Sequence, residues 1–193
     1  MRLGFAAVLL SLATLPALAD RALADDVSDR LQAAIAANDA GDLKTAGAEL
    51  AAATQAMAAK KSALLNAALP AAPQGWTMTV NEEYTQSLSM AGGGTGTEAR
   101  YDGPDGSYVN VTYVMESPLM AMMMGMFGNA QTLAMLGKTV EIGGATYLDQ
   151  DNSLVTVVDN RIMITLNGAE TTTLLPFAQA IDHTGLAKFD LPQ

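Results

Sequence analysis

The sequence predicts an α+β protein, with an N-terminal helical hairpin followed by a mostly antiparallel sheet that carries two helices. Three observations lead to this fold class. Residues 25–69 are rich in alanine and contain no proline. From Thr77 onward, apolar and polar residues alternate as they do in strands. Within this second part, two stretches each contain three strand-like runs and one helix-like run, which indicates a possible repeated β-β-β-α unit.

Residues 1–19 have the pattern of an export signal. Arg2 is followed by an apolar run over 3–15, then by Pro16 and the triplet Ala17-Leu18-Ala19. We expect cleavage before Asp20, with 22–24 as an alternative site five residues later. The pattern predicts an exported protein, periplasmic in a Gram-negative cell and otherwise secreted, with no stable membrane span once the signal is removed.

Composition narrows the function classes. Removing residues 1–19 takes away one of the 10 basic residues and none of the 20 acidic ones, so the net charge becomes 9 − 20 = −11. Such an acidic chain repels phosphate backbones and anionic headgroups, which argues against nucleic acid as a partner. The absence of cysteine excludes disulfides, thiolate metal sites, a cysteine nucleophile and a lipid-bearing cysteine.

The expected hairpin occupies residues 20–69 and turns at residues 38–41. Its first helix places Val27, Leu31 and Ile35 four residues apart on one face. In the second helix, large apolar residues recur every seven positions, and they are Leu43, Leu50, Met57 and Leu64. Both faces suit an antiparallel hairpin, in which the intervening alanines allow the backbones to approach closely.

One segment of this hairpin resembles a known repeat. Gly41, Asp42, Leu43, Ala46, Leu50 and Ala53 follow the spacing of the turn and second helix of a tetratricopeptide repeat. The resemblance covers about thirty residues and a single unit, whereas such repeats normally stack in about three copies. It implies a helical hairpin that meets a partner, and it implies no particular binding residues. A plain alanine-rich hairpin that packs on its own domain is the alternative.

The Pro/Gly-containing segment 70–76 is the expected linker, and Trp76 is expected to anchor it to the α+β domain, residues 77–193. The first predicted repeat has strands at 77–84, 95–101 and 107–115 and a helix that starts near Pro118. The second has strands at 138–148, 154–158 and 161–167 and a helix at 174–181. Residues 102–106 and 159–160 are expected to form hairpin turns.

The methionine-rich segment 115–126 is the most unusual chemical feature of the chain. A helix over this segment would place Met120, Met123, Met124 and Phe127 on one face, and Met122 and Met126 on the opposite face. Three interpretations remain open. In the first, the helix packs in the core or against a subunit. In the second, it forms a groove for an apolar ligand or partner, with contacts from Met120, Met122, Met123, Met126 and Phe127. In the third, Met122 and Met126 bind Cu(I).

Other candidate sites have simpler explanations. His183, the only histidine, follows the last predicted helix and is expected to be a solvated cation, although Asp182 beside it could orient the ring. The run 92–97 lacks the lysine of a phosphate-binding loop and is expected to be a hairpin loop. Residues 149–153 resemble the start of a calcium loop but lack its glycine and final carboxylate, so a polar turn is expected. Glu82 and Glu83 are expected on opposite faces of a strand.

These observations favour a non-enzymatic exported protein that binds a protein partner or an apolar ligand in the cell envelope. No catalytic motif is present, and no cofactor is expected. The alternatives are a Met-based copper carrier and a structural subunit of an envelope complex. A homo-oligomer is compatible with each of them.

Overall fold

The structure is a computed structural model that describes residues 16–91, 93–118, 120, 127 and 130–190. The chain forms two compact units, the first ending at Met57 and the second beginning at Ala58, so their boundary lies within a helix. The first unit is helical, and the second contains the sheet. The predicted α+β class is confirmed.

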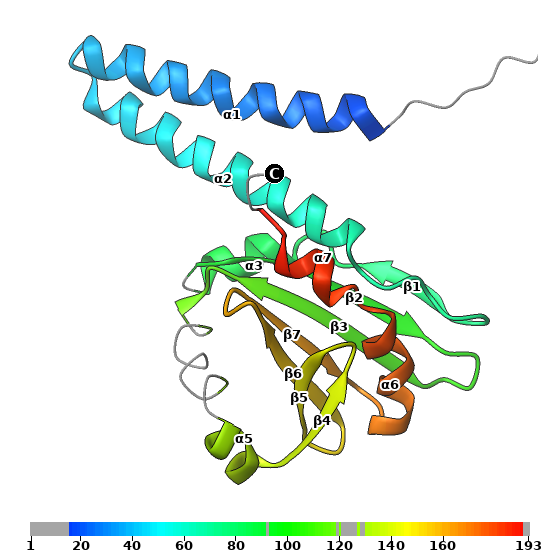
Figure 1. Ribbon diagram of the computed structural model, residues 1–193. Coiled ribbons are helices and arrows are strands. Elements are labelled where there is room, and N and C mark those ends of the chain that lie inside the picture. The colour runs from blue at the N-terminus through cyan, green and yellow to red at the C-terminus, as the bar shows by residue number, and fades with distance from the viewer. Residues whose placement is uncertain (1–15, 92, 119, 121–126, 128–129, 191–193) are drawn as a thin grey trace, which may run out of the picture. The chain divides into compact units, whose positions relative to one another are not determined.

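The helical hairpin forms around the predicted turn (Figure 1). Helix α1 spans Pro16–Asp39 and α2 spans Leu43–Ala67. Gly41 has a φ of 78°, a left-handed conformation that glycine adopts without strain. The Asp42 carboxylate accepts hydrogen bonds from the backbone N–H of Thr45 at 3.0 Å and from its hydroxyl at 2.7 Å, which caps α2. Helix α1 begins at Pro16 rather than near Asp25, and so includes residues on both sides of the predicted cleavage point.

The apolar faces expected to pack inside the hairpin are largely exposed. Among the hairpin side chains whose burial is described, Val27 is half-buried, and five large apolar ones have exposed fractions from 39% to 72%; these are Leu31, Ile35, Leu43, Leu50 and Met57. Ala53 and Ala56 are buried instead. Small side chains take the buried positions, so the larger ones are left at the surface of this unit.

The second unit is built on one antiparallel sheet of seven strands in the order β1-β2-β3-β7-β6-β5-β4 (Figure 1). The strands are β1 Thr77–Val80, β2 Thr95–Asp102, β3 Tyr108–Met115, β4 Lys138–Ile142, β5 Ala145–Asp149, β6 Ser153–Val158 and β7 Ile162–Asn167. The last strands of the two predicted repeats, β3 and β7, pair at the centre, in a register from Asn110 opposite Asn167 to Met115 opposite Ile162.

Short helices contact this sheet at several places. Helix α3 (Tyr84–Met90) packs on β2, and α5 (Ala130–Leu136) packs on β4. Helix α6 (Thr171–Ala180) contacts β4, β6 and β7, and α7 (His183–Ala187) contacts β6. The turns expected at 102–106 and 159–160 join β2 to β3 and β6 to β7.

Three local predictions were wrong because a turn or a helix replaces part of the expected element. The first strand ends at Val80, where the Asn81 side chain accepts a hydrogen bond from the Glu83 backbone N–H and starts a turn into α3. Glu82 and Glu83 therefore lie in a turn rather than on a strand. The segment after α3 joins that helix to β2, so the expected hairpin loop between two strands is absent there. The strand predicted over 138–148 folds back at 143–144, where both glycines have positive φ.

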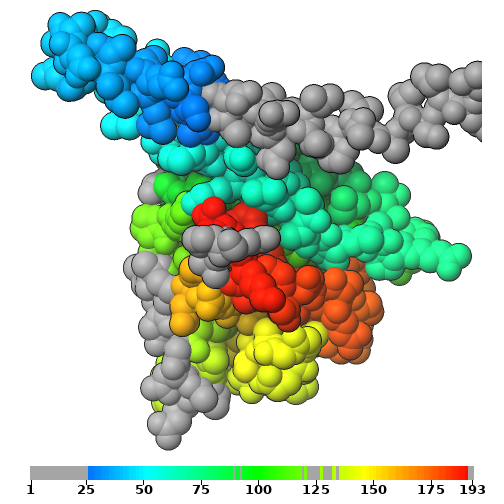
Figure 2. Space-filling model, turned by 45° about the horizontal axis from the view of Figure 1, so that its top comes forward, coloured from blue at the N-terminus to red at the C-terminus, as the bar shows by residue number. Residues whose placement is uncertain are grey.

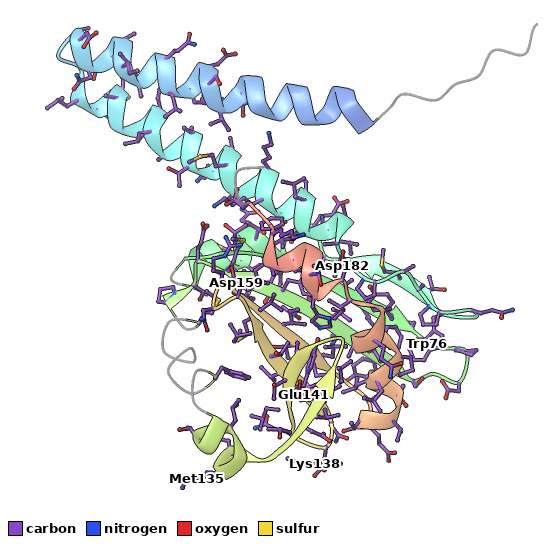
Figure 3. The ribbon with its side chains drawn as sticks, in the orientation of Figure 1. Trp76, Met135, Lys138, Glu141, Asp159 and Asp182 are labelled. Atoms are coloured by element: carbon purple, nitrogen blue, oxygen red, sulfur yellow. The ribbon has the colours of Figure 1, made fainter. Side chains whose placement is uncertain are left out.

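The main core lies on one face of the sheet and anchors the linker. It includes Tyr101, Phe177 and Leu65, which comes from the part of α2 that belongs to the second unit. The ring of Trp76 meets that of Phe177 edge-on with centroids 5.0 Å apart, as expected for an anchor (Figure 3). The Tyr101 hydroxyl donates to the Pro70 carbonyl at 2.6 Å, and burial raises the pKa of Tyr101 to about 12, so the donor stays protonated.

Candidate functional site

A cavity of about 850 Å³ opens in the second unit between the β4–β5 hairpin, β6 and α7. Its wall combines apolar side chains with hydroxyl, imidazole and charged groups. Its lining includes Phe127, Leu133, Glu141, Val157, His183 and Lys188. Figure 2 shows the C-terminal segment, in red, directly against the β4–β5 hairpin, in yellow, so two segments distant in sequence form this side of the cavity.

The cavity is lined by the parts of β5 and β6 that lie beyond a short ladder between these strands. Strand β5 pairs with β4 along its whole length, but it pairs with β6 only at Leu148 opposite Val155 and Asp149 opposite Leu154. Beyond these pairs, the hydroxyl of Thr156 donates to the carbonyl of Thr146 at 2.7 Å. At this point a side-chain hydrogen bond joins β5 and β6, beyond the last pair of the backbone ladder.

His183 occupies this part of the cavity wall. It is the first residue of α7, whose N-cap Asp182 accepts a hydrogen bond from the Gly185 backbone N–H at 2.9 Å. The side chain is only 7% exposed, and its Nε2 lies 2.7 Å from the hydroxyl oxygen of Tyr147. Gly143 allows this placement, because a Cβ at that position would lie 2.6 Å from His183 Nδ1.

The two hydrogen-bonded rings are both neutral near pH 7. Burial lowers the pKa of His183, and the Ile181 carbonyl and the Asp182 charge oppose this effect only in part. Burial raises the pKa of Tyr147 well above its ordinary value. The His183–Tyr147 pair therefore supplies a polar group without net charge, held in one orientation by its own hydrogen bond.

Charged groups at the cavity are held by neighbouring residues. Glu141 accepts a hydrogen bond from the Thr146 hydroxyl, and Asp159 pairs with Arg161 at 3.1 Å. Figure 3 shows Glu141 on β4 and Asp159 near the end of β6. Lys188, which follows α7, adds a positive charge to the wall.

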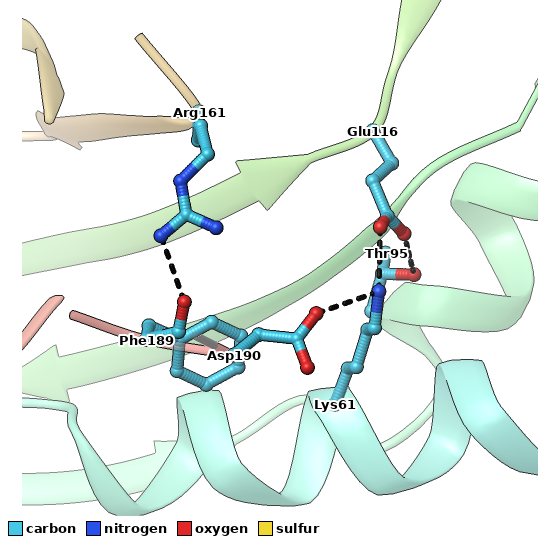
Figure 4. Close-up of polar contacts among 6 residues, drawn as sticks. All are labelled: Lys61, Thr95, Glu116, Arg161, Phe189 and Asp190. Atoms are coloured by element: carbon cyan, nitrogen blue, oxygen red, sulfur yellow. Dashed lines mark hydrogen bonds and ion pairs between the residues drawn. The ribbon is translucent and has the colours of Figure 1, made fainter. Parts of the chain in front are cut away.

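A second set of contacts fixes the end of α7 and the residues after it (Figure 4). Arg161 donates through Nη2 to the carbonyl oxygens of Ala187 at 3.3 Å and Phe189 at 2.7 Å. Lys61 forms ion pairs with Glu116 and, at 2.9 Å, with Asp190. Burial lowers the pKa of Lys61, but these hydrogen bonds more than offset that effect and place its pKa above its ordinary value. The wall formed by α7 is thus tied to both the sheet and α2.

The methionine-rich segment is only partly within the described residues. Phe127 lines the cavity, as does Leu133 from α5. Met120 is 5% exposed and lies outside the main core cluster. Leu148 and Val155 are also buried outside that cluster, and because they alternate with core residues along their strands, they lie on the opposite face of the sheet. These observations agree with packing of Met120 over the second face of the sheet.

Met122, Met123 and Met126 lie outside the described residues. The copper hypothesis, which rests on Met122 and Met126, therefore stays a prediction. Within the described part of the chain, no group of three or more His, Cys, Asp or Glu side chains is placed to hold a metal ion.

The expectation that His183 is a solvated cation was wrong. Burial against Tyr147 makes it a neutral wall group, and Asp182 caps α7 instead of orienting the ring. The helix signal was present in the sequence, because Asp182 lies three residues before Gly185, which is an N-cap spacing. The partner was not predictable from spacing, since Tyr147 is 36 residues away. The turn over 149–153 forms between β5 and β6 as predicted.

Among the helices in the described ranges, none has both the length and the apolar character needed to cross a membrane. No family model matches the chain, and no characterised protein or solved structure shows significant similarity to it. The chemistry of the cavity is therefore the basis for a functional proposal.

Proposed function

We propose that this chain is an exported binding protein that holds a small amphipathic molecule in the cavity beside His183. The observation that carries the proposal is a cavity of about 850 Å³ whose wall contains His183, which is neutral and is fixed by its hydrogen bond to the buried Tyr147. Export rests on the signal pattern of residues 1–19.

The size and lining of the cavity support a ligand site. Pockets for small molecules typically measure about 300–1,000 Å³ and combine apolar walls with a few oriented polar groups. Phe127, Leu133 and Val157 provide apolar surface for the body of a ligand. The ring of His183 is held by Tyr147 before the ligand arrives, so this part of the wall costs no ordering on binding, and Thr184 and Lys188 add polar groups beside it.

Binding fits the chemistry of these groups better than catalysis does. A nucleophile needs an adjacent base that can accept its proton. His183 Nε2 is already engaged by Tyr147, whose raised pKa keeps the hydroxyl protonated. The described wall of the cavity contains threonines but no serine, and the chain has no cysteine. We therefore propose a binding role for this cavity rather than a catalytic one.

Native mass spectrometry of protein purified from its own envelope tests this proposal, because it retains bound small molecules. Titration with dodecanoate, dodecanol and dodecylamine then identifies the preferred polar group. We expect at least one of these three to bind, and Val157→Phe, which fills the cavity, to weaken binding at least tenfold.

Met163→Phe is the matched control. Met163 pairs directly with Val157 on the neighbouring strand and is half-buried like it, but it does not line the cavity. Equal weakening by both variants, or no bound molecule and no binding of any of the three amphiphiles, contradicts the proposal.

A further inference from the structure

The charged side chains that line the cavity are not all paired. Asp159 forms an ion pair with Arg161, whose guanidinium also donates to two carbonyl oxygens of the C-terminal segment. Glu141 accepts a hydrogen bond from Thr146, but it has no cationic partner among the described residues. Lys188 forms no ion pair with a described residue either. The described wall therefore carries one negative and one positive charge that no neighbouring side chain compensates.

These two charges lie where the cavity meets solvent, whereas its apolar lining is less exposed. The side chains of Glu141 and Lys188 are exposed. Leu133 and Val158 are only 4% and 7% exposed, and Phe127 is half-buried. A molecule in this cavity would meet apolar surface on its inner side and charge at the opening. This arrangement favours an amphiphile whose head group lies at the opening.

The two uncompensated charges come from different elements around the cavity. Glu141 lies on β4 in the β4–β5 hairpin, and Lys188 follows α7 (Figure 3). A ligand with a single charge would be attracted by one of these groups and repelled by the other. A ligand that carries both charges can pair with both groups, and its head has no net charge that the acidic chain would repel.

We propose that the ligand of this cavity is a single-chain amphiphile with a zwitterionic head group, the chemistry of a lysophospholipid. This inference rests on the ligand site proposed above and specifies the class of its ligand. The ammonium of the head pairs with Glu141, the anionic group pairs with Lys188, and the chain lies against Leu133 and Phe127. The volume of about 850 Å³ is near the upper end of small-molecule pockets, which gives room for both head and chain.

Isothermal titration calorimetry of the naturally processed protein at pH 7.5 tests this inference. The ligands are dodecylphosphocholine, dodecanoate, dodecylamine and dodecanol, which share one chain and differ in the head, each below its micelle concentration. We expect dodecylphosphocholine to bind about tenfold or more tightly than dodecanol, and about fivefold more tightly than either singly charged molecule. An ion pair at an exposed site contributes up to about fivefold in affinity. Phosphocholine without the chain should bind about 100-fold more weakly or less, because it buries no apolar surface.

Two variants assign the charges. Lys188→Gln should weaken binding of dodecylphosphocholine and dodecanoate about fivefold and should not weaken binding of dodecylamine or dodecanol. Glu141→Gln should weaken binding of dodecylphosphocholine and dodecylamine by about the same factor and should not weaken binding of dodecanoate or dodecanol. Lys138→Gln and Glu82→Gln are the matched controls, because these exposed residues carry the same charges but do not line the cavity. Neither control should change the affinity for any of the four molecules.

The ligand site and its ligand class would fail in different ways. If none of the four chain-bearing molecules binds, both the site and the class are wrong. If dodecanol binds and Val157→Phe weakens its binding, but dodecylphosphocholine binds no more tightly than dodecanol, the site stands and the zwitterionic class is overturned. Equal weakening by Lys188→Gln and Lys138→Gln, or binding of phosphocholine as tight as that of dodecylphosphocholine, also overturns the class.

Discussion

Replacing Tyr147 with phenylalanine removes the hydroxyl that holds His183 and leaves the buried ring in place. The two groups are 2.7 Å apart, and the side chain of Tyr147 has no solvent exposure. In the variant, Nε2 of His183 faces a phenyl ring and loses its partner. Leaving such a buried polar atom unsatisfied costs about 1–3 kcal/mol, so we expect the free energy of unfolding to fall by that amount.

Urea unfolding at pH 7.5 measures this change through the fluorescence of Trp76, the only tryptophan, which packs in the same unit. The thermal midpoint should also fall, by roughly 2–4 °C for each kcal/mol lost. Tyr108→Phe is the matched control, because Tyr108 is exposed, and it should change stability by less than about 0.5 kcal/mol. If Tyr147→Phe proves as stable as this control, water in the cavity replaces the hydroxyl, and the pair does not hold the wall together.

Three further predictions concern other contacts of the structure. His183 should titrate below its ordinary pKa of 6.5 in the folded protein, which NMR can follow without overlap because it is the only histidine. Folding favours the neutral form of His183, so its contribution to the free energy of unfolding should be complete above pH 6.5 and should decrease as the pH falls from 6.5 towards the pKa in the folded protein. In His183→Gln this decrease should disappear. Gly96→Ala should lower the free energy of unfolding by about 1–3 kcal/mol, because the added Cβ would lie 2.4 Å from the Tyr113 carbonyl oxygen. Gly47→Ala has open space at its Cβ and should raise the helix content. Urea unfolding and circular dichroism should therefore show a loss in the first variant and a gain in the second. Lys61→Met removes two ion pairs, so it should lower the free energy of unfolding by about 1 kcal/mol and speed amide hydrogen exchange over residues 186–190. Lys138→Met is the control and should have little effect, because the single ion pair of Lys138 is 3.8 Å long. Unchanged exchange in Lys61→Met would mean that Arg161 alone holds this segment.

Local signals in the sequence account for most of the elements. The break at residues 38–41 predicted the hairpin turn because glycine and asparagine favour helix ends. Alternation predicted β2, β3, β6 and β7 to within a residue or two at each end. These features depend on a few neighbouring residues, which is the range over which propensity and periodicity act.

Errors occurred where a short turn outweighed the local pattern. The run over 138–148 alternates well enough for one strand, but two glycines with positive φ divide it into β4 and β5. The hairpin residues Leu31 and Leu50 follow a helical period correctly, yet the pattern does not specify which neighbour covers them. Periodicity identifies an apolar face, and only packing decides whether that face is buried.

The chain alone determined the fold class, the helical hairpin, the hairpin turns and the chemical limits set by a single histidine and no cysteine. It also supplied the export pattern on which the proposed location rests. Only the tertiary structure decided that His183 is buried against Tyr147, that the ladder between β5 and β6 is short, and that a cavity lies between the β4–β5 hairpin, β6 and α7. The reason is physical. Turns and helices form from contacts within a few residues, whereas the cavity depends on strand pairing and on a contact 36 residues apart, whose register no local pattern specifies.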